Sequence, residues 1–231
     1  EQTAAEIFDE IMDFANYAFN KAHAVCYAVV SYRTAYLKCH YPREYLAALL
    51  TSVLDVPGKI SEYIAEAKEM GIRVLPPDVN SSEDGFSVSG EDIRFGLAAI
   101  KNVGRAFMRQ LVEERQANGP YTSLMDFCER LYDKDLNRRA LESMIQAGAF
   151  DSMGFHRSQM LAVYERVVDA VANERRKNVE GQLDLFGMGV ENVQDEEIAM
   201  PNLPEMGKKE LLALEKQTTG LYLSGHPMDA Y

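Results

Sequence analysis

Cysteine is scarce in this sequence, which has three in 231 residues: Cys26, Cys39 and Cys128. Their odd number and the lack of any Cys-x-x-Cys spacing argue against a disulfide framework and against a zinc site. The four histidines are scattered along the chain and form no cluster with metal-ligand spacing. We therefore expect reduced thiols and no metal site.

Long apolar runs are also missing. The longest apolar-rich stretch, residues 22–37, is interrupted by four polar residues, and no charged segment with a cleavage site opens the chain. We therefore expect no membrane partner and a cytoplasmic location.

The composition, 47% hydrophobic and 26% charged, is ordinary for a globular protein of one large or two small domains. The chain starts without methionine and stops in mid-pattern, so we interpret it as an excerpt of a longer protein.

No motif of a catalytic centre is present. The sequence has no phosphate-binding glycine-rich loop, no nucleophile elbow, and no pair of strand-borne carboxylates suited to two-metal phosphoryl transfer. Acidic neighbours do occur at residues 195–197, but within an acidic tail. We therefore expect no catalytic residue and no cofactor in these 231 residues.

The net charge of −12 is unevenly distributed. Residues 178–231 hold ten acidic residues against three lysines, whereas residues 93–112 hold four basic residues and no acid. A local excess of positive charge is typical of a nucleic-acid surface, although a solvated cationic helix face would have the same composition.

Apolar residues recur at helical spacing along most of the chain, which predicts a mainly α fold. Residues 86–95 instead alternate around a polar turn and predict one small β-hairpin. The Pro76-Pro77 pair marks a connector, and we place a domain boundary near residue 73. We expect little regular structure in residues 179–204. Helices are expected before Pro42 (two), from 42 to 54, 57 to 70, 97 to 101, 105 to 116, 124 to 131, 136 to 147, 156 to 177 and 208 to 216.

Residues 97–112 have the pattern of two helices joined by a very short turn, a helix-hairpin-helix. Gly104 removes the Cβ where a phosphate would approach, and Val103 is expected to fill the core beneath the turn. Lys101, Arg105 and Arg109 would neutralise phosphates without reading sequence.

Asn102 stands where such hairpins usually have glycine. Asparagine tolerates left-handed backbone, so we expect the turn to survive. A second helical pair around residues 136–150 adds Arg138 and Arg139, and tandem hairpins bind duplex better than one. The alternative is a structural hairpin that only packs.

A short apolar island lies in the acidic tail, where nothing else favours apolar residues: Gln182, Leu183, Asp184, Leu185 and Phe186. A glutamine followed by an aliphatic and aromatic pair suits a partner protein's pocket with a polar rim. The alternative is a last helical turn that packs on its own domain.

Several long motifs, taken in order, resemble the alpha subunit of bacterial DNA polymerase III, the replicative C-family DNA polymerase. They lie at residues 19–23, 27–38, 40–45, 75–80, 95–101, 136–141, 148–151 and 219–227. The resemblance implies distal fingers helices in 1–72, a tandem helix-hairpin-helix region in 73–155, a helix in 156–178, and a clamp-binding motif with a linker toward an OB domain in 179–231.

The resemblance also implies a function, DNA-directed DNA synthesis by the full-length parent. The expected partners are double-stranded primer-template, the sliding clamp bound through Gln182–Phe186, and other replisome subunits. Asn20, Lys21 and His23 would face primer-template or incoming nucleotide. The family's palm aspartates, which hold two magnesium ions, are not in this chain, so the fragment alone should be inactive.

Two rival interpretations stay open. One is a non-catalytic helical adaptor whose acidic tail recruits a protein and which never contacts DNA. The other is an error-prone paralogue of the same polymerase; such paralogues generally lack a good clamp motif, so the pentapeptide argues against it.

Overall fold

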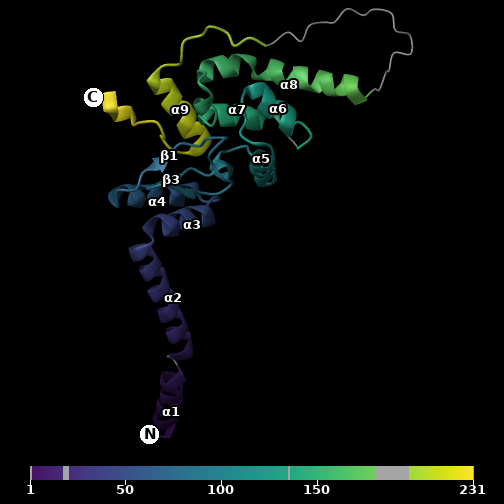
Figure 1. Cartoon of the computed structure of the whole chain (residues 1–231). Coiled ribbons are helices and arrows are strands. Elements are labelled where there is room, and N and C mark those ends of the chain that lie inside the picture. The colour runs from purple at the N-terminus through teal and green to yellow at the C-terminus, as the bar shows by residue number, and fades with distance from the viewer. Residues whose placement is uncertain (1, 18–20, 135, 180–197, 231) are drawn as a thin grey trace, which may run out of the picture. The chain divides into compact units, whose positions relative to one another are not determined.

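The computed structural model describes residues 2–17, 21–134, 136–179 and 198–230. These residues are mainly helical with one small sheet, as the sequence predicted (Figure 1). The chain divides into two compact units, residues 1–45 and 46–231, and the division falls within α3 (Pro42–Ser52). No helix in the described part is long and apolar enough to span a membrane.

The first unit contains α1 (Gln2–Tyr17), α2 (Lys21–His40) and the start of α3. None of the residues of α2 is buried, although large apolar side chains such as Val25, Val30 and Tyr32 occur along it. Apolar residues lie on all sides of α2 rather than on one stripe. That distribution is typical of a helix that is covered on every side within a larger domain.

The second unit begins with the rest of α3, followed by α4 (Pro57–Glu69). Pro57 occupies the first turn of α4, where a missing N–H leaves no bond unmade. α4 buries Ile60 and Ala67, and the chain then turns at Gly71. The boundary expected near residue 73 therefore lies inside this unit, and the predicted domain ranges stay predictions.

The sheet has three short strands in the order β1 (Val74–Leu75), β3 (Asp92–Arg94), β2 (Ser87–Ser89). β2 and β3 form the predicted antiparallel hairpin. β1 pairs in parallel with β3, with Val74 opposite Ile93. The sequence indicated only extended backbone at β1, because a two-residue strand is too short to show a period.

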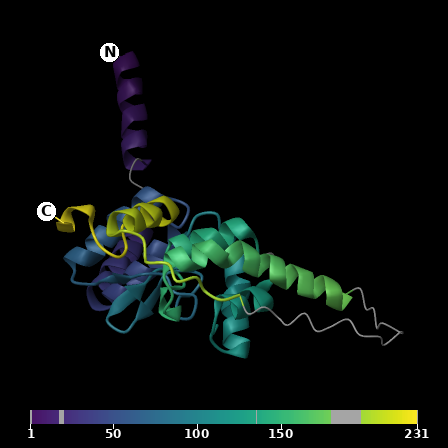
Figure 2. The same ribbon diagram turned by 90° about the horizontal axis from the view of Figure 1, so that it is seen from above.

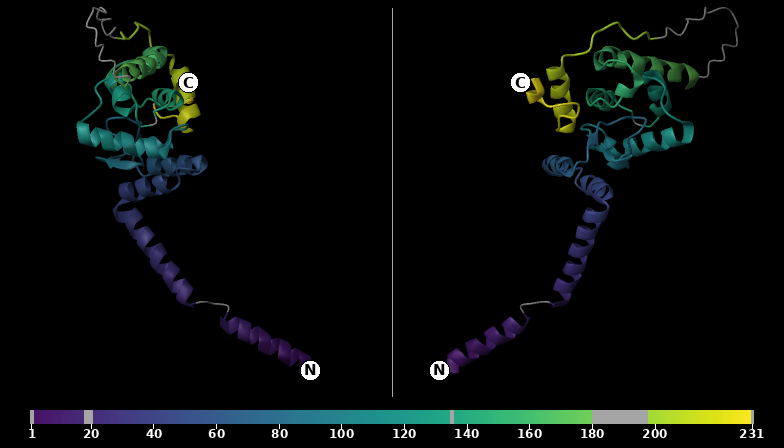
Figure 3. Two further views of the ribbon diagram at one scale, coloured as in Figure 1. Left: turned by 90° about the vertical axis from the view of Figure 1, so that its right-hand side faces the viewer. Right: turned by 60° about the vertical axis from the view of Figure 1, so that its left-hand side comes forward.

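The helices α6 (Leu124–Leu131), α7 (Arg138–Gln146) and α8 (Arg157–Val179) share a core, which α8 covers from outside (Figures 2 and 3). α6 and α7 both pack on α8, and α9 packs on α7. Phe127 lies in the centre, edge-on to Phe150 and to Tyr121, with ring centroids 4.9 Å apart in each pair. The elements are η1 (Leu97–Ala99), α5 (Arg105–Asn118), α6 (Leu124–Leu131), α7 (Arg138–Gln146), η2 (Asp151–Met153), α8 (Arg157–Val179), α9 (Lys208–Thr219) and η3 (Pro227–Ala230).

The helix expected at residues 97–101 is a single 3₁₀ turn, η1. The N–H groups of Leu97 and Ala98 donate to the carbonyls of Glu83 and Asp84 at 3.0 and 2.9 Å. At the C-terminal end of η1, Ile100 has extended backbone with ψ 129°. An α-helix therefore cannot continue through this residue. Leu97 and Ile100 are both buried, three residues apart, which matches the 3₁₀ period.

A buried ion pair fastens α9 to the start of α8. Arg157 and Glu215 are 5% and 0% exposed, and the Arg157 Nη1 to Glu215 Oε1 distance is 3.1 Å. The second carboxylate oxygen of Glu215 accepts the N–H groups of Leu223 and Ser224. Because both charges are satisfied, the pair fixes where α9 and the following segment lie.

Residues 198–204 lie in no helix or strand, as expected for this part of the range 179–204. Most of that range, including 180–197, lies outside the described residues.

Candidate nucleic-acid interface

The turn between η1 and α5, residues 100–104, carries the candidate site. Ile100 is 2% exposed and anchors the turn in the core, whereas Val103 is only partly buried. The core position assigned to Val103 from the sequence is therefore filled by Ile100. Lys101, Asn102, Gly104 and Arg105 are exposed. The turn thus presents its polar groups to solvent.

Asn102 adopts the expected left-handed backbone, with φ 65°. It is the only non-glycine residue with positive φ among the described residues. Its side-chain Nδ2 donates a hydrogen bond to Ser143 Oγ at 3.0 Å, across to α7. Ser143 was not foreseen, because a residue 41 positions away gives no local signal.

Lys101 is held by the C-terminal end of α9. Its backbone N–H donates to the Thr218 carbonyl at 2.8 Å, and its Nζ donates to the Gln217 carbonyl at 2.9 Å. A helix C-terminus carries partial negative charge, so it stabilises the ammonium group there. The side chain predicted to contact phosphate is thus positioned by a helix more than 100 residues later.

Arg105 and Arg109 lie on the first turns of α5 and remain exposed. Arg105 pairs with Asp55 at 2.6 Å and Arg109 with Asp84 at 3.6 Å. The segment 93–112 contains no acid, but the fold brings acids to it from other elements. These exposed pairs are weak, of the order of 0–1 kcal/mol each.

The N-terminus of α5 is open. Gly104 is the N-cap residue and no side chain caps the helix, so the first amides lack intrahelical partners. A Cβ built on Gly104 meets no atom within 4 Å, and its φ of −76° suits any residue. The protein's own packing therefore does not require glycine at this position.

The second hairpin places Arg138 and Arg139 at the start of α7, both exposed. The side chain of Asn137 caps this helix by accepting the N–H of Ala140 at 2.8 Å. Arg138 pairs with Asp169 on α8. Arg139 precedes Ser143 by four residues and so lies one turn away on the same face of α7.

The other predicted site residues lie elsewhere. Lys21 and His23 are in the first turn of α2, in the other compact unit, where the His23 ring lies 4.4 Å from that of Tyr27. Asn20 and the pentapeptide Gln182–Phe186 lie outside the described residues.

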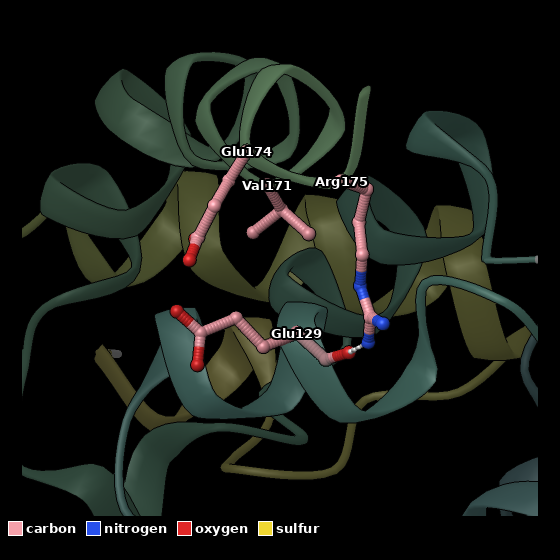
Figure 4. A pocket seen from close by; sticks show the side chains of 4 residues that line it. All are labelled: Glu129, Val171, Glu174 and Arg175. Carbon is pink, nitrogen blue, oxygen red and sulfur yellow. Dashed lines mark hydrogen bonds between the residues drawn. The ribbon is translucent and has the colours of Figure 1, made fainter. Parts of the chain in front are cut away.

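The described ranges contain a small hollow and no metal site. No three His, Cys, Asp or Glu residues there are grouped so as to hold a metal ion. A hollow of about 210 Å³ between α6 and α8 is lined by Glu129, Val171, Glu174 and Arg175 (Figure 4). Arg175 donates to the Glu129 carbonyl there at 3.1 Å. The hollow is smaller than the roughly 300 Å³ at which ligand pockets begin.

Comparison with known proteins gives matches along the whole chain. Residues 71–160 match the family model described as "Helix-hairpin-helix motif". The DNA polymerase III subunit alpha of Saccharopolyspora erythraea is 43% identical over 235 residues, covering 99% of this chain and 20% of the relative. The subunits of Chlamydia pneumoniae and Thermus aquaticus are also 43% identical, over 99% and 100% of this chain and 18% of each relative.

The chain spans about a fifth of the length of these relatives. The family model covers η1 and the helices α5, α6 and α7. It therefore includes both groups of basic residues, the turn with Lys101 and Arg105 and the start of α7 with Arg138 and Arg139. The resemblance seen in the sequence is therefore confirmed: the chain is homologous over its whole length to a segment of DNA polymerase III alpha subunits, and this segment includes a helix-hairpin-helix region.

Proposed function

We propose that this chain is a duplex-holding and clamp-tethering segment of a replicative DNA-directed DNA polymerase. The observation that carries the proposal is the exposed cationic turn at residues 101–105, open at the α5 N-terminus, with Arg109 one turn further on. Backbone amides and basic side chains of this kind contact phosphates and read no bases. Binding would therefore be non-specific and salt-sensitive.

Arg105 and Arg109 are in exposed ion pairs with carboxylates, and a DNA phosphate could take the place of each carboxylate. Arg105 and Arg109 side chains are 52% and 68% exposed, and their partners Asp55 and Asp84 are 83% and 50% exposed. Since such pairs contribute little, a DNA phosphate can replace either carboxylate at small cost. The guanidinium groups are thus kept near the surface where duplex would lie.

The clamp-tethering part rests on the sequence of Gln182–Phe186 and on the homology to alpha subunits. A peptide that binds a ring around DNA makes each rebinding of the polymerase an intramolecular event, so modest affinity gives long synthesis runs. Replacing both Leu185 and Phe186 by alanine should abolish binding to a purified sliding clamp and leave duplex binding unchanged. Clamp affinity equal to wild type would reject this assignment.

The remaining parts of the proposal concern the parent protein. The α2 start, with Lys21 and His23, together with Asn20, would contact primer-template or incoming nucleotide. Magnesium would be held by palm carboxylates outside this segment, other replisome subunits would be further partners, and the setting would be cytoplasmic. The error-prone paralogue is the alternative within the same family.

Duplex binding is tested by fluorescence anisotropy of a labelled primer-template titrated with this chain at about 50 and 200 mM salt. We expect saturable binding at the lower salt that weakens steeply at the higher. Equal affinity for duplexes of unrelated sequence is also expected. No binding at low salt would favour the non-catalytic adaptor instead.

A further inference from the structure

The hydrogen bond from Asn102 to Ser143 joins two hairpins that are separate in the sequence. Asn102 belongs to the turn before α5, and Ser143 lies in the middle of α7. Ser143 is 4% exposed, so its hydroxyl is shielded from water where it accepts this bond. A bond between an exposed turn and a buried hydroxyl fixes the turn against α7.

The position of Ser143 on α7 relates this contact to charge. Arg139 lies one helical turn before Ser143 on the same face, where Cβ atoms are about 5–6 Å apart. The Asn102 side chain is therefore held next to the face of α7 that carries Arg139. Arg139 itself is exposed.

The turn is also fixed on its other side. The backbone N–H and Nζ of Lys101 donate to the last carbonyls of α9. Neighbouring residues of one short turn are thus attached to two different helices. The contact of the turn with Ser143 on α7 is made by the Asn102 side-chain amide.

We propose that Asn102 is a positioning residue, which holds the first cationic turn in register with Arg139 so that both hairpins contact one duplex together. This inference rests on the proposed function. Asparagine suits the role for two reasons: it tolerates the left-handed backbone, and its amide reaches α7. Glycine would satisfy the backbone but lacks the amide.

The test uses Ser143→Ala and Asn102→Gly, each alone and combined with Arg139→Ala, in the duplex-binding titration. Both variants remove the hydrogen bond and keep the backbone conformation, since alanine is a good helix former and glycine accepts positive φ. Each should weaken binding about threefold to tenfold when Arg139 is present, the range expected for one hydrogen bond. In the Arg139→Ala background the further weakening should be under about twofold.

Lys209→Ala is the matched control, because Lys209 is an exposed lysine on α9. In that background Ser143→Ala and Asn102→Gly should retain their full effect. The melting temperatures of all variants should stay close to wild type, which separates positioning from unfolding.

The inference is overturned if the hydrogen-bond variants weaken binding by the same factor with and without Arg139, or if neither variant weakens binding while wild type binds. Failure of the wild-type chain to bind duplex is a different result. It rejects the proposed function, and the positioning role is then rejected with it.

Discussion

The Arg105 guanidinium donates to the Asp55 carboxylate at 2.6 Å, although the two residues are 50 positions apart in the chain. Asp55 follows α3 and Arg105 begins α5, so the contact exists only in the folded protein. The Asp55 carboxylate thus binds the guanidinium group that, in the proposed function, would bind a DNA phosphate. If the proposed function holds, Asp55 competes with DNA phosphate for the Arg105 guanidinium.

Replacing Asp55 by asparagine should strengthen duplex binding. The change removes the competing negative charge and leaves Arg105 in place, so affinity should rise about twofold to fivefold at low salt and less at high salt. Anisotropy titrations at two salt concentrations measure both values. Glu62→Gln is the control, because it removes one negative charge from another exposed ion pair, with Lys59. Equal increases in the two variants would show a general charge effect rather than competition at Arg105.

Replacing Gly104 by alanine should separate folding from binding. The backbone at Gly104 is extended and a Cβ there meets no protein atom, so stability should change by no more than about 1 kcal/mol. The added methyl group would stand where phosphate is proposed to approach, and duplex affinity should fall several-fold. Urea unfolding and the DNA titration measure the two properties. Unchanged DNA affinity would argue against phosphate contact at Gly104.

Replacing Gly148 by alanine should, unlike the change at Gly104, cause a large decrease in stability. Gly148 has φ 83°, and an added Cβ would clash with the Arg157 guanidinium. That guanidinium has little freedom to move, because it is bound to Asp151 and Glu215. Gly154→Ala is the control, since Gly154 has φ 79° but open space around it. The control should lower the unfolding free energy by about 1–2 kcal/mol, and Gly148→Ala by clearly more. Equal decreases in urea unfolding would mean that only backbone strain matters.

Acid should weaken the junction between residues 201–206 and α8 through Glu205. Burial raises the pKa of the Glu205 carboxyl, but the N–H groups of Met206, Arg157 and Ser158 and the nearby His156 together lower it below the ordinary 4.5. A lowered folded pKa means that this stabilisation is complete above the unfolded pKa and is lost as pH falls through the folded value.

Urea unfolding between about pH 6 and pH 3 tests this contribution of Glu205. Glu205→Gln should remove part of the fall in stability seen in wild type at the acid end. Replacement of the exposed Glu210 by glutamine should leave the wild-type pH dependence intact. A Glu205→Gln profile parallel to wild type would assign the acid sensitivity to other groups.

Local patterns in the sequence were enough for most of the fold. Helical periods, Pro57 and Gly71 indicate α4, and the polar turn at residues 89–92 indicates the hairpin of β2 and β3. The left-handed backbone of Asn102 was also predictable, because few residue types tolerate it. One exception is η1, where the N–H groups of Leu97 and Ala98 donate to the carbonyls of Glu83 and Asp84 in a preceding loop; another is β1, which is too short to show a period.

The partners of the site residues could not be predicted in the same way. Asp55, Ser143 and Gln217 contact the turn from positions 41 to 116 residues away. Such contacts depend on how helices pack, and a single sequence contains no local pattern that reports them. The sequence therefore located the cationic groups but not the groups that hold or compete for them.

The salt dependence of binding tests whether the cationic turn at residues 101–105, together with Arg109, contacts DNA phosphates. Wild type should be compared with a variant in which Lys101, Arg105 and Arg109 are each replaced by glutamate. We expect the variant to bind more weakly, with a slope of log affinity against log salt that is flatter by about 0.9 for each phosphate that it no longer neutralises. A variant with the wild-type affinity and slope would show that these side chains do not bind DNA.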